Sequence, residues 1–351
     1  MAAILQLYLA RSGLGGSVAA AETLLLAAID QLAEEQLLAS LHEGFCGVAW
    51  AIEHASHLAP EIADPSWNDG LDDVLGDLVA LPHANADLVY GLAGIGIYGL
   101  ERGDRGSARR WTRAIIDQLD RMAQPGQRGG RCWPAFGKTG TVSFQIDFGM
   151  AHGTPGPIGF LAGAIFARFE HAALVPLLRD AVEALLAWQL EDGGFAMGVP
   201  VARDEGMSRA RTAWCYGDPG VASALLLAAR AAGYRGWEEQ AVAVARAACR
   251  RPAIETGVLD AAFCHGSAGL AHIYNRLGQE TGDAELCEAA RGWYLDTLDR
   301  GARGILEDEL FKRSFLSGTL GIGLSLLAAV TDVAPDWDRV AALSSAGGKS
   351  C

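Results

Sequence analysis

Basic residues are scarce in this sequence. There are 28 Lys and Arg against 42 Asp and Glu in 351 residues, which gives a formal net charge of −14. Nucleic-acid binding depends on clustered Lys and Arg that neutralise phosphates, so this balance argues against a nucleic acid as partner. Half of the residues are apolar, which excludes a disordered chain. The length is ample for burying a large core.

Long apolar runs are also missing. The longest stretch without an acidic or basic residue, 148–167, contains His152, Pro155, Pro157 and several glycines, which makes it a poor membrane span. The apolar start, residues 1–10, is not preceded by the Lys or Arg that a signal peptide requires. We therefore expect neither an integral membrane protein nor an exported one. Seven cysteines, an odd number spread along a long chain, argue against a disulfide framework and for a reduced, cytoplasmic protein.

Strand-like alternation is nearly absent, whereas glycine is abundant. The 44 glycines are about one residue in eight, against roughly 7% in average proteins. The pattern Gly-x-x-Gly precedes a weakly charged, apolar segment six times, starting at Gly44, Gly91, Gly153, Gly217, Gly266 and Gly318. Amphipathic segments follow, among them 108–122, 177–190, 237–250 and 284–298. This order predicts a buried helix followed by an amphipathic helix, repeated along the chain.

The N-terminus fits the same phase. Residues 2–10 match the end of a first inner helix, and 19–38 match its outer partner. We therefore expect an all-α fold of inner and outer helices with the first inner helix truncated. Seven such units would form an α/α toroid if they close on themselves, and an open solenoid if they do not. Residues 1–340 should form this single domain, and 341–351 a flexible tail. The segment 167–211 should contain only an outer helix and a short connection at Asp192, with no room for an inserted subdomain.

Three copies of the glycine pattern contain reactive side chains. They span 149–156, 214–220 and 264–269, and each has a His or Cys immediately before the glycine turn. Equivalent positions in separate repeats should project these groups toward one end of the array. Cys215, Cys264 and His265 together offer two thiolates and one imidazole, a ligand set suited to Zn²⁺. Three protein ligands leave a fourth position open, as in a catalytic zinc site.

These blocks resemble those of the lanthionine synthetase C-like family. Its blocks of the types Ala-His-Gly-x-x-Gly, Trp-Cys-Tyr-Gly-x-Pro-Gly and Cys-His-Gly-x-x-Gly stand at 151–156, 214–220 and 264–269, in the family's order. The resemblance implies an α/α toroid of seven inner and seven outer helices, and a zinc held by the residues matching Cys215, Cys264 and His265. It also implies functional roles for His152, for Arg211 and for Asp87, in an earlier glycine block.

The resemblance further implies a lanthionine synthetase, a cyclase that adds peptide Cys thiols to dehydroalanine or dehydrobutyrine in the same peptide and so forms lanthionine or methyllanthionine rings. We expect His152 to protonate the α-carbon, Arg211 to stabilise the enolate oxygen or position the peptide, and Asp87 to orient or stabilise His152 or Arg211. Trp214 and Tyr216 flank the zinc cysteine, and either line the peptide groove or pack around a helix start.

The expected partner is a dehydrated precursor peptide, together with a dehydratase and a transporter in a biosynthetic complex. No kinase or dehydratase domain precedes the cyclase in this sequence, so a stand-alone enzyme is expected. Two alternatives stay open: a related enzyme that adds glutathione to dehydroamino acids in proteins, and a non-catalytic, zinc-bearing peptide-binding scaffold. The remaining histidines, His42 among them, lie outside the paired blocks and are expected to be structural.

Overall fold

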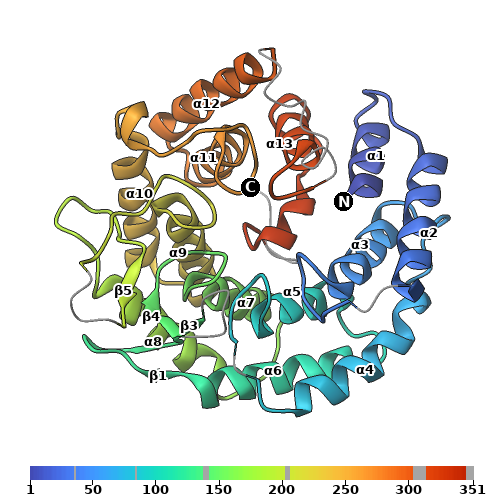
Figure 1. Cartoon of the computed structure of the whole chain (residues 1–351), viewed down its shortest axis with the longest axis horizontal. Coiled ribbons are helices and arrows are strands. Elements are labelled where there is room, and N and C mark those ends of the chain that lie inside the picture. The colour runs from blue at the N-terminus through green and yellow to red at the C-terminus, as the bar shows by residue number, and fades with distance from the viewer. Residues whose placement is uncertain (35–36, 84, 137–141, 202–205, 303–313, 345–351) are drawn as a thin grey trace.

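Seven helices form a closed inner ring. The computed structural model describes residues 1–34, 37–83, 85–136, 142–201, 206–302 and 314–344. Each inner helix packs against the next, and the first contacts both the second and the last, so the ring closes on itself. Figure 1 shows this ring, which confirms the predicted all-α toroid. The inner helices are α1 (Ala2–Arg11), α3 (Phe45–Leu58), α5 (Leu92–Arg102), α7 (Pro155–Phe166), α9 (Asp218–Ala232), α11 (Ser267–Thr281) and α13 (Thr319–Val330).

A second layer of helices surrounds the ring (Figure 1). Most outer helices pack on the inner helix that precedes them, while α4 is attached through the short 3₁₀ helix η1 (Pro65–Asn68) and through α6. The described residues contain six: α2 (Val18–Glu34), α4 (Asp69–Ala80), α6 (Ala108–Met122), α8 (Leu174–Leu186), α10 (Arg235–Cys249) and α12 (Ala284–Ala302). The first ends at Glu34, short of the predicted residue 38, and residues 35–36 lie outside the described part.

The two layers differ in burial as the sequence pattern predicts. The inner helix α9 is buried over most of its length, from Asp218 to Ala229. The outer helix α6 buries one stripe, including Trp111, Ile115 and Leu119, and turns its charged residues outward. In the described part of the chain, no helix combines the length and the apolar character needed to cross a membrane.

The second glycine of each Gly-x-x-Gly copy sits directly against backbone. In all six copies, a Cβ atom built on this glycine would come within 3.0 Å of the carbonyl oxygen six residues earlier. For Gly94 this is the oxygen of Leu88, and for Gly269 that of Phe263. None of these glycines has a positive φ, so it is the missing side chain, rather than a special backbone conformation, that the position requires. The loop before each inner helix can therefore fold back onto the first turn of that helix.

Neighbouring loops are joined by backbone hydrogen bonds. Val89 N–H donates to the Ala151 carbonyl at 3.2 Å, Ala151 to Cys215 at 3.3 Å, Cys215 to Cys264 at 3.2 Å, and Cys264 to Leu316 at 2.7 Å. Each of these residues lies two positions before the first glycine of its copy. The residues that precede the glycines are thereby gathered at one end of the ring, which we call the site end.

Two small antiparallel sheets lie at the periphery (Figure 1). One pairs β1 (Gln124–Pro125) with β2 (Arg131–Cys132), and the other has the order β3 (Ala135–Phe136), β4 (Val142–Asp147), β5 (Gly198–Pro200). Strand β5 corrects the prediction that 167–211 contains only a helix and a short connection. These strands span two to six residues, too few for alternation to be visible in the sequence.

The chain after α13 turns into the centre of the ring instead of forming an outer helix. The 3₁₀ helix η3 (Asp336–Ala341) buries Trp337 against the rings of Phe263 and His272, at centroid distances of 5.7 and 4.5 Å. Residues 341–343 are buried as well, so the predicted flexible tail begins with packed residues. The rest of that predicted tail, 345–351, lies outside the described residues.

The glycine contacts lead to a stability prediction. Gly94→Ala should lower the free energy of unfolding by about 1–3 kcal/mol, because the new methyl group meets the Leu88 carbonyl. Gly76→Ala in α4 is the matched control, since a Cβ there meets nothing within 4 Å and should raise stability by about 0.5–1 kcal/mol. Denaturant unfolding followed by circular dichroism measures both. Equal stability of the two variants would contradict the argument.

Candidate metal centre and active site

The structure brings Cys215, Cys264 and His265 together. One ligand atom from each lies within 4.8 Å of the others. Cys215 comes from the loop before α9, and the other two from the neighbouring loop before α11. The backbone hydrogen bond from Cys215 N–H to the Cys264 carbonyl fixes the separation of the two loops. The three predicted residues, which come from two separate loops, therefore form one compact group of donors.

The protonation of this cluster suits a metal ligand set. The Cys264 thiol beside it lowers the pKa of Cys215 to about 5, and the same contact raises the pKa of Cys264. The Asp260 carboxylate, followed by Cys215, raises the pKa of His265 to about 9. One sulfur is thus a thiolate at neutral pH, and binding a divalent ion would release the two remaining protons. Two sulfurs and one imidazole nitrogen fit Zn²⁺ with a fourth position open.

Asp260 supports His265 from behind. Its Oδ2 lies 3.2 Å from His265 Nε2, while Oδ1 accepts the Ala262 N–H at 2.8 Å. Metal-binding histidines commonly donate their other ring N–H to such a carboxylate, which fixes the ring orientation. The sequence analysis missed Asp260. Its signal is positional: Asp260 precedes Gly266 by six residues, as Arg211 precedes Gly217 and as a third residue, Asp147, precedes Gly153.

His152 and Asp87 form a second group. His152 Nδ1 lies 2.9 Å from Asp87 Oδ2, and the Asp87 side chain is 4% exposed. Asp87 Oδ1 accepts the N–H groups of Tyr90 and Gly91 at 2.6 and 2.9 Å, so the carboxylate is held in place. Burial opposes the charged imidazole, but Asp87 outweighs burial and raises the pKa of His152. With Nδ1 engaged, Nε2 is the nitrogen that can meet a substrate.

The side chains immediately before four of the first glycines follow one another around the site end. The ring of Tyr90 stacks on His152 at 5.5 Å, and the ring of Tyr216 lies 6.1 Å from His152 on another side. Burial, and after it the neighbouring Glu43, raises the pKa of Tyr90 to about 12. We call Glu43, Tyr90, His152 and Tyr216 the arc. The arc runs from the His152–Asp87 pair toward the Cys/His cluster. His152 lies close enough to this cluster for the charge on Cys215 to contribute to its raised pKa.

Arg211 and Trp214 occupy different environments. Arg211 is exposed, and its backbone pairs with that of Gly217 in the loop that contains Cys215. After Cys264 and His265, its charge also contributes to the lowered pKa of Cys215. Trp214 is fully buried, and its Nε1–H donates to the Ala341 carbonyl at 2.9 Å. Of the two alternatives for Trp214, burial favours packing around a helix start, here against the central C-terminal segment.

Asp147 is a buried carboxyl group that the sequence analysis also missed. Its Oδ1 accepts the Gly149 N–H at 2.7 Å, and Oδ2 is buried without a hydrogen-bond partner among the described residues. Burial raises its pKa to about 7. The charge of Asp147 in turn raises the pKa of His152 and of Tyr216. Asp147 therefore adds to the negative field that favours a protonated His152.

Comparison with known proteins places the chain in a family and shows a shared fold. A family model described as lanthionine synthetase C-like protein matches residues 3–341. Among solved structures, the chain is similar to nisin cyclase, with a TM-score of 0.72 and 19% sequence identity, over 92% of this chain and 85% of that one. At this identity, the structural likeness shows the shared toroid fold.

Removing one cluster sulfur tests the metal centre. Cys264→Ala should lose most bound zinc, because the remaining donors rarely hold the ion tightly, whereas Cys287→Ala, at an exposed cysteine of α12, should keep it. Both variants should retain helical circular dichroism, since the apolar inner ring does not depend on the cluster. Elemental analysis of chelator-free preparations measures the zinc. Unfolding of Cys264→Ala would instead mark the metal as structural.

Asp260 generates a graded prediction. Asp260→Asn should weaken zinc binding about 10- to 100-fold without abolishing it, because the ligand set is intact and only the support of His265 changes. Competition with a chromogenic chelator measures the affinity. Asp104→Asn, an exposed carboxyl in the loop between α5 and α6, is the control and should bind zinc as the wild type does. An unchanged affinity in Asp260→Asn would remove the supporting role.

Proposed function

The chain belongs to the lanthionine synthetase C-like family, and we propose that it is a zinc-dependent cyclase of dehydrated precursor peptides. It would add peptide cysteine thiols to dehydroalanine or dehydrobutyrine in the same peptide and form lanthionine or methyllanthionine rings. The observation that supports this most is the pairing of a Cys/Cys/His cluster with the His152–Asp87 pair at one end of the ring. A scaffold that only binds peptides would not need a proton donor beside its metal site.

The cluster prepares the nucleophile. Cys215, Cys264 and His265 would hold Zn²⁺, which when bound supplies a Lewis acid that makes a substrate thiol a thiolate at neutral pH, where a free thiol with a pKa of about 8.5 is mostly protonated. Asp260 keeps the imidazole of His265 turned toward the sulfurs. The exposed Arg211 adds positive charge on the same side, where it would position the peptide or stabilise an enolate oxygen.

His152 would donate the proton that the α-carbon requires. Formation of the C–S bond at the β-carbon moves an electron pair toward the carbonyl oxygen, and the α-carbon must then accept a proton. His152, whose Nδ1 is held by Asp87, would deliver this proton from Nε2. The raised pKa favours the protonated imidazole, the form that a general acid requires. Tyr216 and Tyr90 beside it would hold the reacting part of the peptide.

The proposal is tested at His152. His152→Asn should keep zinc and the helical fold but lose at least about a hundredfold in cyclisation rate, the lower range for general acid catalysis. His171→Asn is the control and should cyclise normally, because His171 lies in the connection between α7 and α8 and pairs with Asp117 of the outer helix α6. Ring formation leaves the mass unchanged, so thiol alkylation followed by mass spectrometry counts the free cysteines.

Two outcomes would favour the alternatives. If the wild type modifies dehydrated peptides only when glutathione is supplied, the glutathione-adding enzyme replaces the cyclase. If zinc-loaded wild type and His152→Asn bind the peptide alike and neither forms rings, the protein is a binding scaffold.

A further inference from the structure

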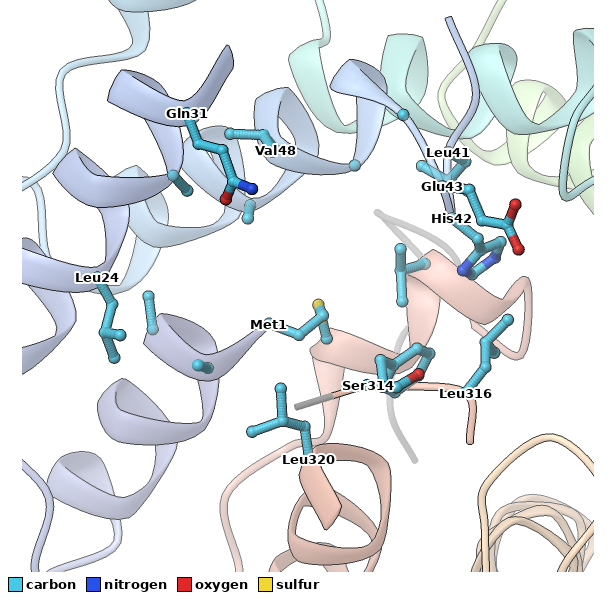
Figure 2. A pocket seen from close by; sticks show the side chains of 18 of the residues that line it. Met1, Leu24, Gln31, Leu41, His42, Glu43, Val48, Ser314, Leu316 and Leu320 are labelled. Carbon is cyan, nitrogen blue, oxygen red and sulfur yellow. The ribbon is translucent and has the colours of Figure 1, made fainter. Parts of the chain in front are cut away.

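A pocket with a volume of about 530 Å³ opens where the two ends of the helical ring meet. Residues 1–3 at the start of α1 form part of its wall, with Leu24, Ala28 and Gln31 of α2 facing it. The loop 41–44 and the segment 314–317 complete it. Figure 2 shows Met1 and Leu320 on one side of the space and Gln31 and Val48 on the other, with His42 and Glu43 at one end.

The pocket lies at the N-terminal end of α1, between the loop before α3 and the loop before α13. Both loops contain a copy of Gly-x-x-Gly, so the pocket opens at the site end.

Two chains of contacts join the pocket to the candidate active site. Along one of them, the ring of His42 faces Phe315 at 6.3 Å, and the next residue, Leu316, accepts the Cys264 N–H at 2.7 Å. Along the other, Glu43 contributes, after burial, to the raised pKa of the Tyr90 hydroxyl, and the ring of Tyr90 stacks on His152. Lining residues of the pocket are thus linked, through Leu316 and through Tyr90, to the Cys/His cluster and to the His152–Asp87 pair.

His42 gives the pocket a polar contact point. It lies two residues before Gly44, the position that Cys215 and Cys264 occupy in their own loops. Its Nε2 is buried and has no hydrogen-bond partner among the described residues. Burial lowers the pKa of His42 to about 4, so the imidazole is neutral at physiological pH. A neutral imidazole nitrogen without a partner can bond a peptide amide.

We propose that this pocket binds an apolar side chain of the substrate peptide beside the reacting cysteine or dehydroamino acid, with His42 contacting the peptide backbone. This inference rests on the proposed function. Among the described residues, the lining is predominantly aliphatic and includes no Lys or Arg, and it is linked to the reacting groups through Phe315 and Glu43. Its volume lies within the range of about 300–1,000 Å³ typical of ligand pockets and exceeds what one side chain requires.

Binding can be measured without turnover. The probe is a fluorescently labelled peptide that keeps its cysteine and carries serine in place of the dehydroamino acid, so that no ring can form. One version has leucine at the positions flanking both residues, and the other has alanine there. Burying a leucine side chain should make the leucine peptide bind to the zinc-loaded wild type at least about tenfold more tightly. Equal dissociation constants for the two peptides would overturn the inference.

A matched pair of variants on α2 locates the effect. Ala28 lines the pocket, whereas the preceding residue, Ala27, is exposed and does not. Ala28→Phe should fill the pocket and abolish the preference for leucine, and Ala27→Phe should leave the preference intact. Both should keep the wild-type zinc content and circular dichroism. Retention of the leucine preference in a folded, zinc-loaded Ala28→Phe protein would place the apolar subsite elsewhere.

The failure of this inference differs from the failure of the proposed function. If the wild type forms rings in dehydrated peptides equally well with leucine or alanine flanks, the cyclase stands and the subsite falls. If leucine peptides bind through the pocket but their dehydrated forms never cyclise, the subsite stands and the cyclase falls.

Discussion

The close approach between the second glycine of each Gly-x-x-Gly copy and the carbonyl oxygen six residues earlier underlies the whole arrangement. It folds the loop before each inner helix tightly onto the first turn of that helix. The loops then lie near enough to one another to bond through their backbones, from Val89 through Ala151, Cys215 and Cys264 to Leu316. A side chain at any of these glycines would push a loop outward and break the series of bonds.

This series of loops determines which side chains can meet. The positions one and two residues before the glycines face the site end in successive repeats, so their chemistry is set by the repeat in which they stand. Cys215, Cys264 and His265 occupy two neighbouring loops and form a cluster of metal-binding donors. His152 occupies the next loop, close enough for Cys215 to influence its pKa but bonded to Asp87 of a different loop. The potential metal-binding donors and the His152–Asp87 pair therefore come from adjacent repeats.

The C-terminal segment packs in the centre of the ring and supports the site end from inside. Trp337 fills the space among inner-helix aromatics, Asp338 accepts from His272 at 3.0 Å, and Arg339 pairs with Glu101 at 3.2 Å. Trp214, next to Cys215 of the Cys/His cluster, donates a hydrogen bond to the Ala341 carbonyl. Core packing at the centre thus fixes the position of a residue adjacent to the cluster, and such support is what a preorganised site needs.

The sequence by itself determined the repeat and the candidate Cys/Cys/His donors, because glycine spacing and helical periodicity are local signals. Closure of the repeats into a toroid was implied by the family resemblance and is shown by the contacts of α1 with α13. The sequence could not show Asp260 behind His265 or the burial of Trp214, since these depend on loops and on a C-terminal segment that are distant along the chain. The short strands were missed because few residues form each of them. His42 looked structural in the sequence. Only ring closure, which brings α1 beside α13, places it in a pocket next to the candidate active site.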